Sequence, residues 1–333
     1  MAPETPNDPV QRRLQELERR CEQLELRVSS LSQAFSRTRH RARRIWLRPP
    51  IWTFEQHSPR NLQVKQAYQA ERPPADAPTF AIVTPAYNQS RYLKATIESV
   101  LSQDYPNLRY HIQDGGSDDQ SLEIMRSYES RLSWRREQDA GQAQAINRGF
   151  NVVSGDIMAY LNSDDMLLPG TLAYVARAFK ERPEVQLVYG HRIYVDREGL
   201  EIGRAVLPRH DAKALYWADY VPQETLFWRR SVWDKIGPLD ESFQYALDWD
   251  FILRAQAAGF KFTRLPRFLA CFRVHDEQKT AAIYDVGREE MQRLRVRYLK
   301  YKPTQAQIQA SIARYLMRQL VVHWMYRLGL LRY

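Results

Sequence analysis

The chain has 333 residues, of which 44% are hydrophobic, enough for one large domain with appendages or for two domains. The polar N-terminus lacks the apolar core of a signal peptide, and no stretch approaches the roughly 18 uninterrupted apolar residues of a membrane-spanning helix. These features predict a cytoplasmic protein. Its two cysteines, Cys21 and Cys271, argue against a disulfide framework and a cysteine-based zinc site.

The net charge of +10 is unevenly distributed. Residues 1–48 contain 11 Lys/Arg against 6 Asp/Glu, and residues 288–333 contain 10 against 2. The middle of the chain, residues 49–287, has 28 against 31. Basicity confined to the ends argues against a core that binds nucleic acid, and favours termini that contact an anionic partner or the cytoplasmic face of a membrane.

The N-terminal region has a heptad pattern, with apolar side chains at alternating spacings of three and four. They are Leu14, Leu17, Cys21, Leu24, Val28, Leu31 and Phe35. About three heptads is the lower limit for a coiled coil. The pattern therefore predicts that residues 1–48 form a helix that makes a homo-oligomer, with packing on the chain's own domain as the alternative. The basic stretch 40–48 fits an anionic membrane surface or a solvated linker equally well.

A linker and an α/β domain follow. Prolines within residues 49–78 predict a stiff linker, and the domain is expected to start at Thr79. The pattern then alternates strand and helix, which is typical of a parallel sheet covered by helices. Residues 80–84, 108–113 and 157–161 are the clearest strands.

Each of these three strands ends in a cluster of polar or turn-forming residues. The clusters are Pro85-Ala86-Tyr87-Asn88, Asp114-Gly115-Gly116-Ser117 and Asn162-Ser163-Asp164-Asp165. Because the carboxyl ends of parallel strands share one edge of a sheet, all three can meet in one ligand site. On spacing alone, Asp164 and Asp165 fit a divalent metal site or the cap of the helix that follows.

In this order and spacing, the segments resemble the nucleotide-sugar-dependent glycosyltransferases of family 2, with the GT-A fold. The resemblance covers roughly residues 79–281 and includes segments 139–149, 246–250 and 272–275. It implies a mostly parallel central sheet flanked by helices. Residues 79–168 would be the nucleotide-binding half and residues 169–281 the acceptor half.

The resemblance also implies roles for individual residues. Donor contacts are expected from Pro85, Ala86, Tyr87, Asp114, Asp139, Gln142, Asn147, Asp164 and Lys279. Tyr87 would lie against the base, Asp114 would bond it, Asp164 would face the ribose and Lys279 a phosphate. Capping of the helix after residue 141 is the alternative role for Asp139.

The catalytic roles implied fall on three residues. Asp165 and His275 would hold Mg²⁺ or Mn²⁺, which has hard oxygen ligands and offsets the charge of a diphosphate. Asp248 would be the general base of an inverting displacement, with helix capping as its alternative role. A helix N-terminus lowers the pKa of a carboxylate there, whereas burial raises it.

The basic residues 282–333 are expected to be helical. Apolar side chains recur every four positions at Ile308, Ile312, Leu316, Leu320 and Trp324. This pattern fits packing on the domain or contact with a membrane surface.

The sequence thus predicts a glycosyltransferase that uses a nucleotide-diphospho-sugar, with UDP favoured because Asp114 suits the imide of uracil. The acceptor is expected to be a glycan or a lipid-linked molecule in surface polysaccharide biosynthesis. Two alternatives stay open, a coiled-coil scaffold with a vestigial GT-A domain and a sugar nucleotidyltransferase. The second usually needs a basic, glycine-rich loop after the first strand, which Pro85-Ala86-Tyr87-Asn88 does not supply.

Overall fold

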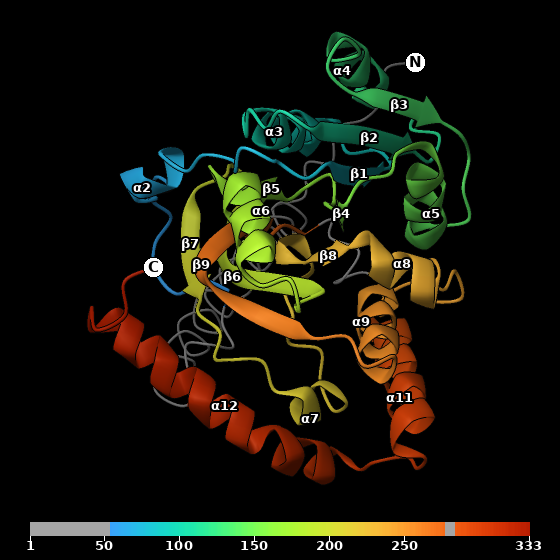
Figure 1. Ribbon diagram of the computed structural model, residues 1–333. Coiled ribbons are helices and arrows are strands. Elements are labelled where there is room, and N and C mark those ends of the chain that lie inside the picture. The colour runs from blue at the N-terminus through green and yellow to red at the C-terminus, as the bar shows by residue number, and fades with distance from the viewer. Residues whose placement is uncertain (1–53, 277–283) are drawn as a thin grey trace, which may run out of the picture. The chain divides into compact units, whose positions relative to one another are not determined.

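The computed structural model of the chain describes residues 54–276 and 284–333, all within one structural unit (Figure 1). The coiled coil predicted within residues 1–48 and the phosphate contact predicted for Lys279 lie outside the described residues.

The first half of the sheet is parallel, as the alternation of strands and helices predicts. Four strands pair in the order β3 (Ser133–Arg136), β2 (Leu108–Asp114), β1 (Phe80–Ala86) and β4 (Ile157–Tyr160). Ala86 at the end of β1 lies opposite Asp114 at the end of β2, and Val83 lies opposite Tyr160. The carboxyl ends of these strands therefore meet at one edge of the sheet.

Helices cover both faces of β1, which explains why this strand is buried along its whole length. Ile82 packs on the side of α3 (Ser90–Leu101), and Ala81 and Val83 pack on the side of α5 (Gln142–Val152). Gly149 permits the close approach of α5, because a Cβ at this position would come within 2.4 Å of Val83 Cγ1. A short helix, α4 (Ser121–Ser127), contacts α3.

The second half of the sheet is mixed. Strand β8 (Phe227–Arg229) runs antiparallel to β4 and to β6 (Leu187–Val195), and β6 runs parallel to β9 (Phe262–Arg273). Strand β5 (Met166–Leu167) pairs antiparallel with β9, and β7 (Glu201–Ala205) forms a hairpin with β6. This half is mixed because short connections such as the β6–β7 turn replace the helical crossovers of the first half.

The remaining helices lie mainly around this second half (Figure 1). They are α2 (Gln66–Gln69), α6 (Thr171–Glu181), α7 (Ala212–Leu215), the 3₁₀ helix η2 (Gln223–Thr225), α8 (Arg230–Ile236), α9 (Leu247–Ala257), α11 (Tyr284–Leu299) and α12 (Gln305–Arg327). None of the helices in the described part of the chain is long and apolar enough to span a membrane.

Helix α12 buries a different stripe from the one that its fourfold spacing suggests. Ile308 and Ile312 are buried, but Trp324 is 51% exposed. A spacing of four advances about 40° per step around a helix of 3.6 residues per turn, so the stripe drifts off the packing face. Tyr315 and His323 take the buried positions instead.

Candidate active site

The loop after β4 is held in place by α3 and β9. The Thr96 hydroxyl lies 2.8 Å from the Ser163 carbonyl and 2.7 Å from the Asp165 carbonyl. The Asp165 side chain is buried, and its Oδ1 accepts a hydrogen bond from the Arg273 backbone N–H at 3.0 Å. The loop therefore presents its two carboxylates in a fixed geometry.

Asp164 lies against the histidine that follows β9. His275 Nε2 is 3.1 Å from Asp164 Oδ2, and the Arg273 Nε donates to the Asp164 carbonyl at 2.9 Å. His275 is itself buried and packs on Tyr92, with 4.6 Å between ring centroids. The structure thus joins the predicted metal residue His275 to Asp164, and Asp165 faces the backbone of β9.

The fit of a divalent cation can be tested on these residues. Burial raises the pKa of Asp165 well above its ordinary value, and the nearby charges of Asp164 and Glu224 raise it further. A cation beside this pair would offset that repulsion. The described residues contain no group of three or more His, Cys, Asp or Glu side chains that would hold a metal alone. Asp164, Asp165 and His275 are donors that suit a divalent cation, and a bound diphosphate would supply further oxygen ligands.

An ion pair that was not predicted from the sequence lies next to these carboxylates. Arg192 of β6 donates from Nε to Glu224 Oε1 at 2.6 Å and from Nη2 to Glu224 Oε2. Glu224 of η2 is buried. A glutamate between Val221 and the apolar run from Leu226 is the only sequence feature that marks this site, and it carries no recognisable spacing.

A chain of amides connects η2 to the end of β4 and the start of α5. Gln142 Nε2 donates to Asn162 Oδ1 at 2.7 Å, and Asn162 Nδ2 donates to Gln223 Oε1 at 3.3 Å. Gln223 Nε2 in turn donates to the Tyr160 carbonyl at 2.8 Å. Gln142, a predicted donor contact, is thereby positioned beside the polar loop after β4.

Asp248 lies in the first turn of α9. Burial raises the pKa of Asp248 to about 6, although hydrogen bonding to the Trp249 N–H and the charge of Arg192 oppose the rise. Burial therefore outweighs the helix N-terminus here. The adjacent Trp249 is fully buried and donates from Nε1 to the Leu215 carbonyl at 2.9 Å, which fixes the start of the helix.

Asp250, two residues further on, has a different environment. Its carboxylate accepts from Arg254 Nε and from Arg297 Nη1, both at 2.7 Å. The pair with Arg254 lies within α9, and the pair with Arg297 ties α9 to α11, which gives Asp250 a structural role.

The charges of four carboxylates act on Tyr160, the last residue of β4. Burial raises the pKa of this phenol well above its usual range. The charges of Asp248, Asp219, Glu224 and Asp165 then add to the shift, in that order. Asp219 was not predicted from the sequence, and burial together with Asp248 raises its pKa. The predicted base and the predicted metal residue therefore both lie within electrostatic reach of the carboxyl end of β4.

The predicted base-binding residues lie at the ends of β1 and β2. Pro85 and Ala86 are buried in β1, and Tyr87 directly after it is 63% exposed, with its ring open to a ligand. Asp114 is fully buried, and its carboxylate accepts from the Gly116 and Ser117 N–H groups at 3.1 and 2.9 Å. The turn therefore fixes Asp114, whose contact with a base stays a prediction.

The side chains of Asp139 and Asn147 make hydrogen bonds to other parts of the protein. Asp139 Oδ1 accepts from the Gly141 N–H at 2.9 Å, at the start of α5. The Asn147 amide donates to the Leu239 carbonyl and to Glu241 Oε1, both at 3.0 Å, and accepts from the Leu239 N–H at 2.9 Å. Asn147 thus anchors the segment around Leu239, and donor contacts by both residues stay predictions.

Comparisons with known proteins identify the family of the chain. The model of "Glycosyl transferase family 2" matches residues 81–238. A "PGL/p-HBAD biosynthesis glycosyltransferase" of Mycobacterium bovis is 31% identical over 183 residues, which are 54% of this chain and 70% of that protein. An uncharacterized glycosyltransferase of Mycobacterium tuberculosis is 33% identical over the same length, with 69% of that protein covered.

Solved structures show the same fold at low sequence identity. S. aureus TarS in complex with UDP-GlcNAc superposes with a TM-score of 0.57 and 19% identity, over 73% of both chains. A mannosyltransferase from Pyrobaculum calidifontis in complex with GDP-Man and Mn²⁺ gives a TM-score of 0.54 and 15% identity, over 90% of this chain and 80% of that one. The GT-A fold predicted from the sequence is confirmed. The chain is a glycosyltransferase and belongs to glycosyltransferase family 2.

Proposed function

We propose that this glycosyltransferase moves a sugar from a nucleotide-diphospho-sugar to a hydroxyl of a glycan or lipid-linked acceptor, with inversion at the anomeric carbon. The observation that carries the proposal is that Gln223, next to Glu224, bonds the Tyr160 carbonyl at the edge where the strands end, and that the charges of Asp165 and Asp248 also act on Tyr160. One site then holds a carboxylate for the diphosphate side and a second carboxylate for the acceptor side.

The donor is proposed to be a UDP-sugar. Asp114 at the end of β2 and the exposed ring of Tyr87 after β1 are adjacent in the sheet, where a carboxylate and an aromatic face suit a uracil. S. aureus TarS, one of the structures of similar fold, was solved with UDP-GlcNAc. The Pyrobaculum protein was solved with GDP-Man, so the fold alone does not select the base.

The reaction is proposed to be a single displacement. Asp248 accepts the proton of the acceptor hydroxyl as the oxygen bonds to the anomeric carbon, and the bond from that carbon to the diphosphate breaks on the opposite side. Asp164, Asp165 and His275 are the residues that would hold Mg²⁺ or Mn²⁺. The bound ion would stabilise the charge of the departing diphosphate.

Replacing Asp165 with asparagine tests the metal assignment. Asparagine keeps the acceptor for the Arg273 N–H but removes the charge, so we expect metal-dependent transfer to fall about 10²-fold or more. Mass spectrometry of the products from a panel of nucleotide sugars, with and without Mn²⁺, would measure this. Asp234→Asn is the matched control, because Asp234 is in an exposed ion pair with Arg230 on α8.

Unchanged Mn²⁺ dependence in Asp165→Asn would refute the metal assignment. The same experiment tests the scaffold alternative. A chain with a vestigial site would turn over none of the nucleotide sugars, whatever the metal.

We also propose that α12 contacts an anionic membrane surface. Met317, Val321 and Trp324 of α12 and Leu328 directly after it follow one another at spacings of four, three and four, and they are between 51% and 70% exposed. The exposed Arg314 and Arg318 lie on the same helix. An apolar stripe beside arginines is typical of a helix that lies in the headgroup region.

Val321→Ser combined with Trp324→Ser tests this contact. Burial of a large apolar side chain contributes roughly 1.5–3 kcal/mol, so the double variant should bind vesicles about tenfold more weakly or worse. Co-sedimentation with vesicles containing phosphatidylglycerol measures the effect. Val286→Ser combined with Val296→Ser, two exposed positions on α11, is the control. Equal binding by both double variants would exclude α12 as the contact.

A further inference from the structure

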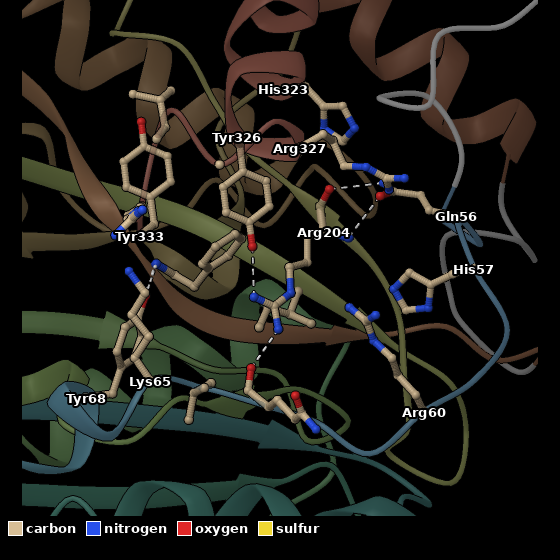
Figure 2. Close-up of a pocket in the computed structure, with 17 residues that line it drawn as sticks. Gln56, His57, Arg60, Lys65, Tyr68, Arg204, His323, Tyr326, Arg327 and Tyr333 are labelled. Carbon is tan, nitrogen blue, oxygen red and sulfur yellow. Dashed lines mark hydrogen bonds between the residues drawn. The ribbon is translucent and has the colours of Figure 1, made fainter.

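A pocket lies apart from the candidate active site. It has a volume of about 670 Å³ and is enclosed by the segment 56–68, by strands β6, β7 and β9, and by the end of α12 (Figure 2). Five of its 17 lining residues are Arg or Lys, and none is Asp or Glu. Its lining is therefore strongly cationic.

Two of the five cations are neutralised by Glu201, a residue that does not itself line the pocket. Arg60 Nη2 and Arg204 Nη2 each lie 2.6 Å from the carboxylate of Glu201, which is fully buried. Although burial opposes it, hydrogen bonds from Arg204 and Arg60 keep the pKa of Glu201 below its ordinary value. Glu201 is therefore ionised, and its carboxylate is bound by Arg60 and Arg204.

The other three cations, Lys65, Arg327 and Arg332, have no such partner: within the part of the chain that the structure describes, none of their side chains makes an ion pair or a hydrogen bond. Lys65 and Arg327 are both exposed. They come from opposite ends of the described chain, and Figure 2 shows them on different walls of the same pocket. Their charges are left for a ligand.

A buried histidine also faces this pocket. His323 is 1% exposed, yet neither ring nitrogen has a hydrogen-bond partner among the described residues. Figure 2 shows its ring beside Arg327 at the rim of the pocket. Leaving a buried polar group unsatisfied costs about 1–3 kcal/mol, so a ligand oxygen that bonded this imidazole would recover stability.

Aromatic rings form the remaining wall. The rings of Tyr326 and Tyr333 stack with 6.0 Å between centroids and 18° between planes, and Phe268 contacts Tyr326 edge-on at 5.6 Å. Arg204 Nη1 donates to the Tyr326 hydroxyl at 2.9 Å, which fixes that ring. This wall offers an apolar surface for the part of a ligand that carries no charge.

We propose that this pocket is a second ligand site, which binds a phosphate-bearing molecule through Lys65, Arg327 and His323 while its uncharged part packs on Tyr326 and Tyr333. The pocket is separated from the candidate active site by the sheet. Ile193 of β6 lines the pocket, whereas the preceding Arg192 bonds Glu224, because neighbouring side chains of a strand point to opposite faces. The proposal does not depend on the donor or the acceptor of the enzyme.

The test compares two double variants of the whole chain. Lys65→Gln combined with Arg327→Gln removes two charges from the pocket, and Lys235→Gln combined with Lys302→Gln removes two exposed charges outside both the pocket and α12. Binding of inorganic pyrophosphate is measured by titration calorimetry in buffer freed of metal ions with a chelating resin. Charge-assisted hydrogen bonds to phosphate are lost only in the pocket variant, so its affinity should fall about tenfold or more.

A second arm separates a soluble phosphate from a lipid headgroup. Both double variants are tested for binding to phosphatidylcholine vesicles with and without phosphatidylglycerol. Loss of pyrophosphate binding in the pocket variant alone supports a soluble ligand, and loss of phosphatidylglycerol binding in the pocket variant alone supports a lipid headgroup. Equal behaviour of the two double variants in both arms, or a wild-type chain that binds neither probe, overturns the proposal.

Discussion

Replacing Asp248 with asparagine is expected to lower the rate of sugar transfer by about 10²- to 10⁴-fold and to leave donor binding unchanged. Asparagine has the same size and keeps Oδ1, which accepts from the Trp249 N–H at 2.8 Å, but it cannot accept the proton of the acceptor hydroxyl. Trp249 and its bond to the Leu215 carbonyl should hold the start of α9 in both proteins. Single-turnover transfer and donor titration, measured separately, would show whether the transfer rate falls while donor binding stays unchanged.

The pH dependence of transfer follows from the same residue. A general base works only when it is deprotonated, and burial raises the pKa of Asp248 to about 6. Transfer by the wild type should therefore rise with pH through about 6 and then level off. That rise should disappear in Asp248→Asn, because no carboxylate titrates at this position.

Asp219 provides the sharpest comparison for this assignment. It is electrostatically linked to Asp248 and is the other carboxylate near the acceptor side of the site. Asp219→Asn should retain most of the transfer rate and the rise with pH. If Asp219→Asn loses transfer while Asp248→Asn keeps it, the proton is accepted by Asp219.

The nucleotide-binding half could be predicted because its strands and the ends of its strands are visible in the sequence as apolar runs followed by polar clusters. Strand β1 lies between two layers of helix, so it is buried throughout and mostly apolar, and Pro85 lies one residue before its end. The parallel pairing then brings Ala86 beside Asp114 by necessity. A polar cluster after each such strand is a reliable indication of the site edge.

The acceptor side could not be predicted in the same way. Arg192 and Glu224 meet only because β8 inserts between β4 and β6, an antiparallel arrangement that the spacing of residues does not reveal. Asp219 lies in a loop without any motif. The cationic pocket joins Lys65 to Arg327 across nearly the whole described chain, so its charges are scattered in the sequence and gathered only by the fold.

Replacing Arg192 with leucine is expected to destabilise the fold by about 3–5 kcal/mol, because it leaves the buried Glu224 without its bidentate partner. The loss of stability is increased by Asp165, because the charge of Glu224 acts on this second buried carboxylate and Arg192 would no longer offset it. Chemical denaturation followed by tryptophan fluorescence would measure the free energy of unfolding. Arg91→Leu breaks an exposed ion pair with Glu198 at 3.4 Å and should cost only about 0–1 kcal/mol.

The double variant Arg192→Leu with Glu224→Leu distinguishes a structural ion pair from one that also serves catalysis. Removing both charges abolishes the uncompensated carboxylate, so most of the lost stability should return. The two charges shift the pKa of Asp248 in opposite directions, Arg192 downward and Glu224 upward, so removing both should leave the pH at which transfer rises close to that of the wild type. Recovery of stability and of transfer together would confine the pair to a structural role, whereas recovery of stability without transfer would show that the pair also serves catalysis.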